Sequence, residues 1–501
     1  MAKKIHKTKK TPLFKNVGFY FVLLYALLTL GMIVQVFTVN VIPMKYAMIV
    51  CVILLLLLLG MYYLQLGKKV NKVNKVLGKI LIIILAVFLG VGNWYLFKTG
   101  SAFSRMTGDD TQTSVVSVVV MKDNKAESIE DLKNSKFGLT KTGTQDIIEK
   151  GLSDIKKDAG QDITTVDYKS YKTIADDLYD GKIDAIIMDE ATRSLFEDNH
   201  SKFDSETRIV KSYKYKTSTK DISKNVDVTS EPFNVYITGI DTYGTISTVS
   251  RSDVNMIATV NPKTHQVLLT SIPRDYYVPQ PCQGGQTDKL THTGIFGVDC
   301  TVETVENYFG IDINYYVRVN FSSVENIVDA LGGINVDSPI AFNALGYSFS
   351  AGTNSLNGKE ALAFSRERYS LGGGDRDRGK NQMRVITGII NKAISPSIIT
   401  NYTSILDAVS GSFQTNMSNS EMTSLIKMQI NDMSGWDIEQ ISVNGTGNAS
   451  AWSPANGFNS WVMEPNVETV KRAVEVMKKV ENGEDVKALA QQVMEENTAD
   501  E

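Results

Sequence analysis

Three apolar runs close to the N-terminus constrain the fold of this chain more than any other feature. They cover Val17–Val39, Met44–Leu66 and Ile80–Phe97. Each run has roughly the 20 residues that a helix needs to cross the hydrocarbon core of a bilayer. Because three runs follow one another and no small-residue cleavage site stands out, they predict membrane-spanning helices and not a cleaved signal peptide. A buried helical hairpin in a soluble core is the alternative.

The lysines that flank these runs predict how the chain lies across a membrane. Residues 1–16 carry six lysines and no acid, and residues 67–79, between the second and third runs, carry five lysines. At the turn between the first and second runs the only lysine is Lys45, the second residue of the second run. Segments rich in lysine stay on the cytoplasmic side. We therefore expect a multi-pass protein of the cell membrane, with a cytoplasmic N-terminus and with everything after about Lys98 outside the cell.

The exported part offers little for zinc or triad chemistry. Its two cysteines, Cys282 and Cys300, can pair as a disulfide in an oxidising space, whereas Cys51 lies inside the second apolar run. The four histidines are scattered, which argues against a histidine-rich metal site and against a Ser-His-Asp triad. The net charge of −3 gives no reason to expect binding to nucleic acid.

The rest of the sequence predicts two α/β regions joined by polar segments. Strand-like runs alternate with helical ones in both, and we expect the larger region to have a central mixed sheet flanked by helices. The smaller region resembles one lobe of an extracellular solute-binding protein, although an accessory domain without a ligand is the interpretation that we favour. The expected divisions are a basic tail (1–16), three transmembrane helices (17–98), a tether (99–114), an accessory domain (115–210), a linker (211–230), the larger α/β domain with C-terminal helices (231–482) and a frayed acidic tail (483–501).

Five arginines cluster within residues 366–384. Arginine presents a planar fork of donors and keeps its charge, so it suits a bidentate grip on phosphate. Arg366 and Arg368 share a face if their segment is extended, and Arg378 and Gln382 share a face if theirs is helical. The cluster predicts a clamp for a polyanion, with a salt-bridged surface loop as the equal alternative because acids are interleaved. The other members of the segment are Arg376, Arg384, the glycines Gly372–Gly374 and the acids Glu367, Asp375 and Asp377.

Charged residues also stand at the ends of predicted strands, which is where open α/β sheets bind ligands. Asp241 ends one strand, Arg251 and Asp253 precede a second, and Arg274 follows a third. Carboxylates and phosphate oxygens together commonly hold Mg²⁺. We therefore expect Asp241 and Asp253 to bind Mg²⁺, with Mn²⁺ as the alternative metal, beside a pyrophosphate. Taken singly, a strand-end aspartate is more often a turn cap, and an arginine there is often a structural ion pair.

These motifs together resemble the LytR-CpsA-Psr family. The resemblance rests on GIDTYG, SRSDVN, SIPRDYYV, DKLTH, the Gly-Gly that closes a capped helix, and SRERYSLGGGDRDRGKNQ, which span residues 231–394. The three apolar runs and the accessory region look like the streptococcal capsule branch of that family.

The resemblance implies a transferase of Gram-positive cell walls. Members move a glycan phosphate, here a capsular or other wall glycan, from a polyprenyl-pyrophosphate carrier to a peptidoglycan sugar hydroxyl, and polyprenyl phosphate leaves. The implied partners are the lipid-linked glycan, peptidoglycan, membrane lipid and membrane proteins of capsule biosynthesis. The implied catalytic residues are Asp241, Arg251, Asp253 and Arg274, of which Asp241 and Asp253 bind the metal, and the implied substrate-binding residues are Arg251, Arg274, Arg366, Arg368, Arg376, Arg378 and Gln382.

The family's lipid tail lies in an apolar tunnel, so apolar helical positions are candidates for its lining. Such stripes are ordinarily just core. The candidates are Ile327, Val328, Leu331, Ile386, Ile389 and Ile390.

Three other functions remain open at this point. A pyrophosphatase would cut the same lipid-linked precursor with water. A binding or sensor module would use the accessory region to bind a soluble ligand. A membrane-bound regulator of capsule production is the third, although a sixteen-residue tail and a thirteen-residue loop cannot hold a helix-turn-helix.

Overall fold

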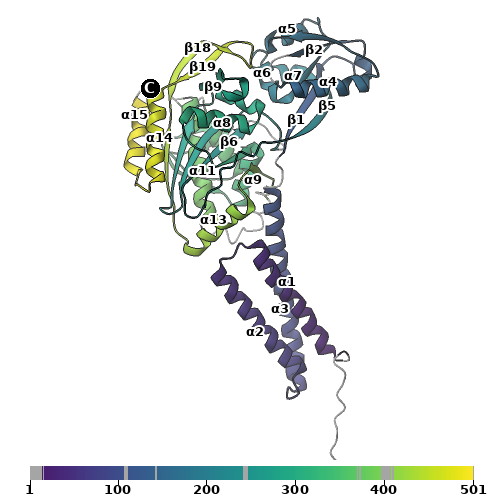
Figure 1. Cartoon of the computed structure of the whole chain (residues 1–501), viewed down its shortest axis with the longest axis vertical. Helices are drawn as coiled ribbons and strands as arrows, with labels where there is room; N and C mark the ends of the chain where they lie inside the picture. The colour runs from purple at the N-terminus through teal and green to yellow at the C-terminus, as the bar shows by residue number, and fades with distance from the viewer. Residues whose placement is uncertain are drawn as a thin grey trace, which may run out of the picture. The chain divides into compact units, whose positions relative to one another are not determined.

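The structure is a computed structural model of the whole chain and divides into two compact units (Figure 1). The first comprises Met1–Ser104 with Asn419–Met433, and the second comprises Arg105–Ser418 with Ser434–Glu501. The residues described are 14, 16–106, 111–140, 144–240, 246–368, 370–371, 374–395, 405, 408 and 411–499.

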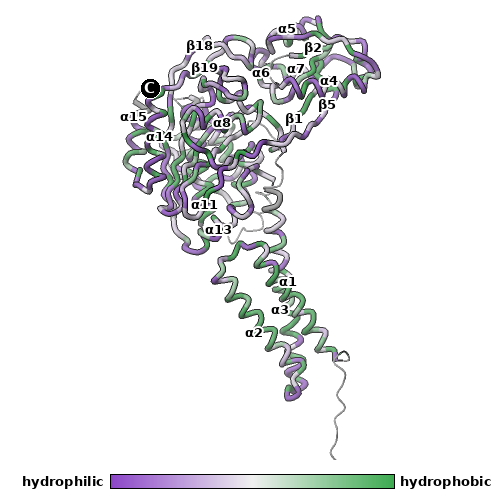
Figure 2. Tube along the Cα trace, in the orientation of Figure 1, coloured by the Kyte–Doolittle hydropathy of each residue, from purple (hydrophilic) through white to green (hydrophobic). Residues whose placement is uncertain are grey.

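The first unit contains three helices that are long and apolar enough to cross a membrane, α1 (Val17–Val39), α2 (Met44–Leu66) and α3 (Lys72–Met106). Figure 2 shows the hydrophobic colour along all three. Tyr25 and Ile82 are buried among them, so the helices pack on one another. A further helix, α13 (Asn419–Asp432), belongs to the same unit.

The predicted tether is wrong over part of its length. Residues 99–106 continue α3, and residues 111–114 begin strand β1 (Thr111–Met121). The polar composition of 99–106 suggested a loop, but an established helix extends at little cost where no proline or glycine run stops it. The Thr99 hydroxyl donates to the Tyr95 carbonyl at 2.8 Å, which satisfies one polar side chain inside the helix.

The accessory region is a five-stranded sheet with the order β3-β2-β4-β1-β5. Strand β2 runs parallel to β3 and β4, whereas β1 runs antiparallel to β4 and β5. Apolar side chains of α4 and α5 pack against the sheet in two separate cores. The element bounds are β2 (Lys136–Thr140), α4 (Gln145–Ala159), β3 (Thr164–Tyr168), α5 (Tyr171–Tyr179), β4 (Ala185–Asp189), α6 (Arg193–Glu197), α7 (Phe203–Glu206) and β5 (Thr207–Ser218).

Strand β5 corrects the predicted linker 211–230, because its second half occupies residues 211–218. This stretch reads KSYKYKTS, and its composition suggested an unstructured segment. The alternation is that of an edge strand, with lysines exposed and tyrosines half-buried. The Tyr215 hydroxyl donates to Asp154 at 2.7 Å, so these tyrosines attach the strand to α4.

The larger region is built on a six-stranded mixed sheet with the order β16-β11-β6-β7-β8-β17. Strand pairs β11–β6 and β8–β17 are parallel, and the others are antiparallel. One face of the sheet buries its apolar side chains against α8, α14 and α15. The bounds are β6 (Phe233–Ile240), β7 (Val254–Asn261), β8 (Gln266–Ile272), α8 (Val298–Phe309), β11 (Tyr315–Asn320), β16 (Phe413–Thr415), β17 (Asp437–Ser442), α14 (Val467–Glu481) and α15 (Lys487–Ala499).

Helix α15 corrects the predicted frayed tail 483–501. Val486, Ala490 and Val493 are at most 3% exposed and belong to the core beneath the sheet. Their spacing of four and three residues is that of one helical face. The prediction missed this apolar stripe because acids and glutamines dominate the composition of the tail.

Three helices and short strand pairs form a second core beside the sheet. Helix α9 begins after Asn320, whose side chain and that of Ser323 form a capping box. A Cβ at Gly388 would lie 2.8 Å from the Asn335 carbonyl, so glycine allows α11 to approach β12 closely. The bounds are α9 (Phe321–Ala330), β12 (Ile334–Ser338), β13 (Phe342–Ala344), β14 (Tyr347–Phe349), β15 (Gly352–Leu356), α10 (Gly358–Arg366) and α11 (Asp375–Ala393).

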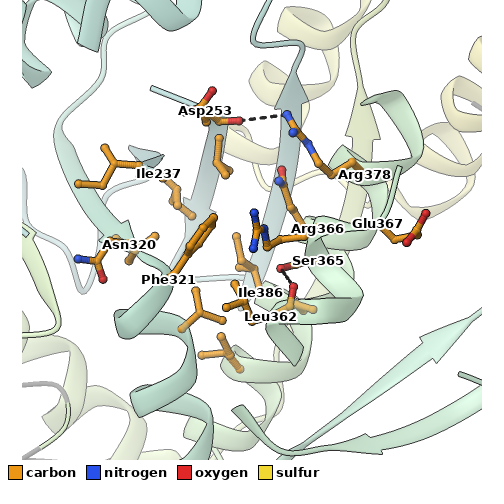
Figure 3. A pocket seen from close by; sticks show the side chains of 18 of the residues that line it. Ile237, Asp253, Asn320, Phe321, Leu362, Ser365, Arg366, Glu367, Arg378 and Ile386 are labelled. Carbon is orange, nitrogen blue, oxygen red and sulfur yellow. Dashed lines mark hydrogen bonds between the residues drawn. The ribbon is translucent and has the colours of Figure 1, made fainter. Parts of the chain in front are cut away.

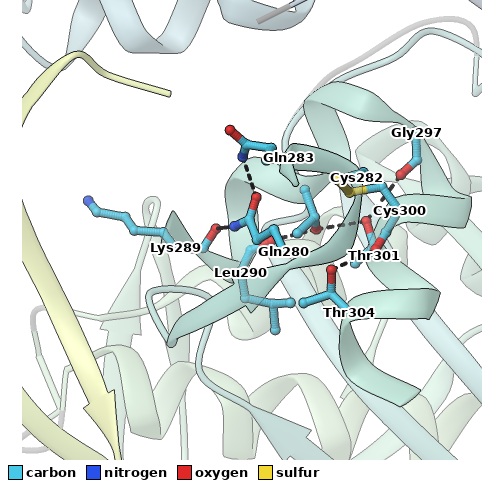
Figure 4. The surroundings of a disulfide bond; sticks show 10 residues. Gln280, Cys282, Gln283, Lys289, Leu290, Gly297, Cys300, Thr301 and Thr304 are labelled. Atoms are coloured by element: carbon cyan, nitrogen blue, oxygen red, sulfur yellow. Dashed lines mark hydrogen bonds between the residues drawn. A yellow bond between two sulfur atoms is a disulfide. The ribbon is translucent and has the colours of Figure 1, made fainter. Parts of the chain in front are cut away.

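Cys282 and Cys300 form a disulfide, with their Cα atoms 5.5 Å apart (Figure 4). Cys282 lies in the turn between β9 (Tyr277–Gln280) and β10 (Gln286–Lys289), and Cys300 lies in α8. The pairing expected from the exported location of both cysteines is therefore present. It fixes the β9–β10 hairpin to the helix that packs beneath the sheet.

Candidate active site

A cavity of about 310 Å³ lies between the sheet and the helices α9, α10 and α11 (Figure 3). Apolar side chains line one part of it, and arginines with one aspartate line another. The lining residues are Ile237, Gly239, Ile240, Asp253, Val254, Val319, Asn320, Phe321, Val324, Leu345, Leu362, Ser365, Arg366, Glu367, Arg368, Arg378, Gln382, Val385, Ile386 and Ile389.

Helix α11 supplies one wall of the cavity. Arg378, Gln382, Val385 and Ile389 recur at intervals of three and four residues and all line it. The predicted helical face of Arg378 and Gln382 therefore points into the cavity, with the arginine nearer the helix N-terminus and the apolar residues further along. Arg378 Nη2 donates to the Asp253 carbonyl at 3.4 Å.

Arg366 and Arg368 approach the same cavity from the end of α10. Arg366 is the last residue of that helix, and Glu367 has the extended backbone that ends it, with φ −64° and ψ 135°. The Arg366 guanidinium lies 4.2 Å from the centre of the Phe321 ring, a cation–π contact that holds its plane (Figure 3). Both arginines line the cavity, as their spacing predicted.

The fifth arginine of the cluster does not join this site. Arg384 lines a separate cavity of about 320 Å³ with Lys380, Asn381 and Met494. Its Nη1 donates to Asn381 Oδ1 at 2.7 Å. Burial lowers the pKa of the Arg384 guanidinium from its ordinary value.

Asp253 and Arg274 form an ion pair at the edge of the main cavity. Arg274 Nη1 lies 2.6 Å from Asp253 Oδ1, and the Thr291 hydroxyl donates to the same oxygen at 3.3 Å. A small adjoining space of about 20 Å³ is lined by Asp253, Arg274, Arg376, Arg378 and Gln382, among others. Asp253, Arg378 and Gln382 thus line both spaces, and they connect Arg274 and Arg376 to the cavity that holds Arg366 and Arg368.

The Asp253 carboxylate is ionised although the residue is only 7% exposed. Burial alone would raise its pKa, but the charges of Arg251 and Arg274 and the hydrogen bonds from Arg274 and Thr291 outweigh burial, so the pKa lies below the ordinary value. A carboxylate held in this way is a weak base and keeps its negative charge at neutral pH.

One predicted site residue of the described part of the chain, Arg251, is not on the wall of either space. Asp241 lies outside the described residues. Arg251 lines neither space, and its Nη1 lies 3.5 Å from Asp198 Oδ2, a residue that follows α6 of the accessory region. Its charge nevertheless acts on Asp253.

The described residues fit a single bound cation only in part. Within them, no group of three or more His, Cys, Asp or Glu side chains could hold a metal ion. Asp253 Oδ1 accepts from Arg274 and Thr291, whereas Oδ2 accepts no hydrogen bond from the described part of the chain. An ionised oxygen with no donor among the described residues, beside a cavity lined by arginines, is what a magnesium site shared with a phosphate substrate would offer.

Sequence reasoning missed several residues of the site. Nothing in the sequence spacing of Phe321 indicated that Arg366 stacks on it. Thr291 lies in the DKLTH motif, which was a usable signal. Among the tunnel candidates, Ile386 and Ile389 line the cavity, whereas Val328 and Leu331 are at most 3% exposed within the neighbouring core.

The family profile described as LytR_cpsA_psr family matches residues 195–478, more than half of the chain. A second profile, described as DNA polymerase processivity factor, matches residues 68–188. That stretch is about a quarter of the chain and includes the third apolar run, so we assign no function from it.

Curated relatives match the same family. The chain is 40% identical over 238 residues to TagU of Enterococcus faecalis, named a polyisoprenyl-teichoic acid–peptidoglycan teichoic acid transferase, covering 46% of this chain and 77% of the relative. TagU of Bacillus subtilis, with the same descriptive name, is 41% identical over 205 residues, covering 41% of this chain and 65% of the relative.

Solved structures of related proteins were also found. The crystal structure of B. subtilis TagU covers 50% of this chain and 96% of its own, with 34% identity and a TM-score of 0.39. A structure of TagT bound to LIIa-WTA covers 52% of this chain and 94% of its own, with 28% identity and a TM-score of 0.42. Because these TM-scores are low, the assignment rests on the sequence matches. With more than half of its length matched by the family profile and 77% of a named transferase covered at 40% identity, the chain belongs to the LytR-CpsA-Psr family of enzymes.

Proposed function

We propose that this protein transfers a glycan phosphate from a polyprenyl-pyrophosphate carrier to a sugar hydroxyl of peptidoglycan and releases polyprenyl phosphate. The observation that carries the proposal is one cavity with an apolar lining and an arginine-rich part. A polyprenyl pyrophosphate likewise has an apolar part, its hydrocarbon tail, joined to an anionic part, its two phosphates. The names of the curated relatives support the same reaction.

In this proposal the arginines bind the pyrophosphate. Arg366, Arg368 and Arg378 line the cavity, and guanidinium groups suit bidentate contacts to phosphate oxygens. The polyprenyl tail lies against the apolar side chains that follow along α11, such as Val385 and Ile389. Arg274 and Arg376 lie beside Asp253 in the adjoining space, where they would face the second phosphate.

The transfer forms one P–O bond and breaks another. The hydroxyl oxygen of the acceptor sugar attacks the phosphorus that bears the glycan, and the bond from that phosphorus to the bridging oxygen breaks. Polyprenyl phosphate leaves with the bonding electrons, and the hydroxyl proton passes to it or to solvent, because the lowered pKa of Asp253 makes that carboxylate a weak base. Arginines neutralise charge on the phosphate oxygens, and such electrostatic work is the main protein contribution to phosphoryl transfer.

We propose that Asp253, together with Asp241, holds Mg²⁺ or Mn²⁺. When bound, the cation would supply positive charge beside the phosphate oxygens. The support is the ionised state of Asp253 and its Oδ2 atom, which accepts no hydrogen bond from the described residues.

The glycan that we propose is an anionic or capsular wall polymer. The relatives are named teichoic acid transferases, and the capsular assignment rests on the resemblance of the three apolar runs and the accessory region to the capsule branch. Peptidoglycan, membrane lipid and capsule-biosynthesis membrane proteins are the proposed partners.

We also propose that the second unit lies outside the cell. The support is the three membrane-length helices and the lysines of the tail and second loop. A periplasm- or surface-active reporter fused after Lys98 should be active, and the same reporter fused between α2 and α3, after Lys69, should be inactive. The reverse pattern would contradict the topology.

The proposed substrate can be tested by the lipid that purifies with the protein. The full chain, extracted in mild detergent, should retain a polyprenyl phosphate or pyrophosphate that native mass measurement detects. Arg378→Ala should lose most of it, whereas Arg384→Ala, on the other face of α11, should keep it. Equal retention by both variants would remove the cavity as the donor site. If water replaces the sugar hydroxyl, the protein is a pyrophosphatase, and its product is free glycan phosphate.

A further inference from the structure

A two-stranded ribbon, β18 (Gly445–Ser453) with β19 (Phe458–Pro465), carries two exposed tryptophans on one face. Trp452 pairs with Asn459, and Asn459 and Trp461 are two residues apart on the same strand. Side chains alternate along a strand, so both indoles share a face. Trp452 is 54% and Trp461 44% exposed, and they are the exposed aromatic residues of the described part of the second unit.

The face also contains hydrogen-bonding groups beside the indoles. A Cβ at Gly447 would lie 3.2 Å from Cζ2 and Nε1 of Trp461, so this indole lies over the glycine. Asn459 Nδ2 donates to Ser450 Oγ at 3.3 Å. We call Ser450, Trp452, Asn459 and Trp461 the tryptophan face. One side of the Trp461 ring is thus held by the ribbon and the side away from Gly447 is available for contact.

The charge of the ribbon limits what can bind it. Residues 445–465 contain one charged side chain, Glu464, whose Oε1 accepts from Asn448 at 2.7 Å. A phosphate-rich polymer would find no cation there and would meet a carboxylate. Large exposed apolar side chains in a cluster usually mark an interaction site. Indoles stack on the C–H faces of sugar rings, and amide and hydroxyl groups bond sugar hydroxyls, so the surface fits an uncharged carbohydrate.

The ribbon is fixed to the segment that follows the phosphate-site arginine. The Met463 amide donates to the Asp275 carbonyl at 2.8 Å, and the Tyr277 hydroxyl donates to the Trp452 carbonyl at 2.8 Å. Residues 275–277 come directly after Arg274. Figure 1 shows β18 and β19 beside β9, in agreement with these bonds. A glycan bound to the ribbon would therefore be attached, through these hydrogen bonds, to the segment that also positions Arg274.

We propose that the tryptophan face binds the uncharged sugar chain of the acceptor, a linear N-acetylhexosamine glycan. The binding itself follows from the ribbon, and only the identification of that glycan as the acceptor rests on the proposed transfer. A phosphate-rich donor polymer does not suit this face, because residues 445–465 carry a carboxylate and no cation. The face would hold the acceptor chain while its hydroxyl reaches the cavity.

Calorimetric titration of the full chain in detergent micelles tests this surface. The probes are soluble N-acetylglucosamine oligosaccharides, which carry no charge. Trp452→Ala with Trp461→Ala should raise the Kd about tenfold or more, and each single variant should raise it severalfold. Trp452→Phe with Trp461→Phe should retain most of the affinity, because an aromatic face remains. Val467→Ala, an exposed apolar position just after the ribbon, is the matched control and should keep the parent Kd.

Several outcomes would overturn the proposal. They are a parent protein that does not bind the oligosaccharides, a double alanine variant with the parent Kd, and a double alanine variant that loses binding to phosphatidylglycerol vesicles or self-association while its glycan binding is unchanged. If the double alanine variant does not fold, as judged by thermal unfolding, the single alanine variants and the phenylalanine pair decide. Retained polyprenyl lipid, measured in the same samples, should not change. Loss of that lipid from the parent would count against the proposed transfer and leave glycan binding to be judged on its own data.

Discussion

Asp189 and Asp253 are both buried aspartates at strand ends, one in each sheet, and their surroundings differ. Asp189 ends β4, is 2% exposed and caps the turn that follows through the Ala191 amide at 3.0 Å. Asp253 precedes β7, is 7% exposed and pairs with Arg274. The space beside Asp189 is about 10 Å³, room for roughly one water, whereas Asp253 borders the cavity of about 310 Å³.

The pKa values of the two carboxyl groups are consequently shifted in opposite directions. Burial raises the pKa of Asp189 to about 6, against hydrogen bonds from Thr144 and Ala191, and its charged neighbour is the acid Glu190. The pKa of Asp253 is lowered, because the charges of Arg251 and Arg274 outweigh burial. Position at a strand end therefore does not make an aspartate functional. The arginines and the open cavity distinguish the site from the cap.

The largest effect should come from removing the carboxylate at the site. Asp253→Ala should reduce glycan transfer on the order of 10³-fold, while lipid retention survives in part because the arginines and the apolar lining remain. Asp189→Ala in the accessory sheet should leave transfer by the folded protein near the parent value. Transfer assays on both variants, matched for folded protein by thermal unfolding, make the comparison. Equal losses would mean that the accessory aspartate also acts in the reaction.

A smaller effect concerns stability and pH at Asp189. A carboxyl whose pKa is raised in the folded state contributes stability that is fully present below the unfolded pKa near 4 and is lost as the pH rises through about 6. Asp189→Asn keeps an acceptor for the cap and cannot ionise. It should therefore flatten this pH dependence and stabilise the accessory sheet at pH 7 on the order of 3 kcal/mol.

Hydrogen exchange of the β4 amides between pH 4 and pH 7 measures that difference, after correction for the intrinsic exchange rate. Asp253→Asn removes the ionised partner of Arg274, so this substitution should not stabilise the protein at pH 7. Parent and Asp189→Asn proteins with the same pH slope would show that Asp189 is not the buried acid described here.

The smallest effect separates arginine geometry from positive charge. Arg366→Lys and Arg378→Lys keep the charge but lose the fork of donors, and Arg366→Lys also loses the flat contact with Phe321. Each should lower transfer and lipid retention about tenfold. Lys380→Arg, on the other face of α11, is the control and should have no effect on either readout. Lysine variants that transfer at the parent rate would show that the site needs the positive charge of these residues and not the fork of donors.

Local spacing predicted the parts of the site that lie on one element. Arg378 and Gln382 share a helical face, and Arg366 and Arg368 reach the same cavity across one extended residue. The three membrane-length helices also followed from composition, because length and apolar content decide them.

Contacts between distant segments could not be predicted in this way. Phe321 contacts Arg366 only because α9 packs on α10. Val328 belongs to the core because its side chain lies on the packed side of α9. The strand at 211–218 and the helix at 487–499 were missed for a different reason. Their polar composition outweighed a period of two in the first and a helical apolar stripe in the second.

The central claim is that the cavity delivers a glycan phosphate to a sugar hydroxyl and not to water. The most direct test incubates the full chain with a polyprenyl-pyrophosphate-linked glycan and purified peptidoglycan, and then measures every phosphorus-containing product by mass. We predict one polyprenyl monophosphate released for each glycan phosphate attached to the wall, with both products lost in Arg378→Ala. Free glycan phosphate that accumulates at the same rate with and without peptidoglycan would contradict this account.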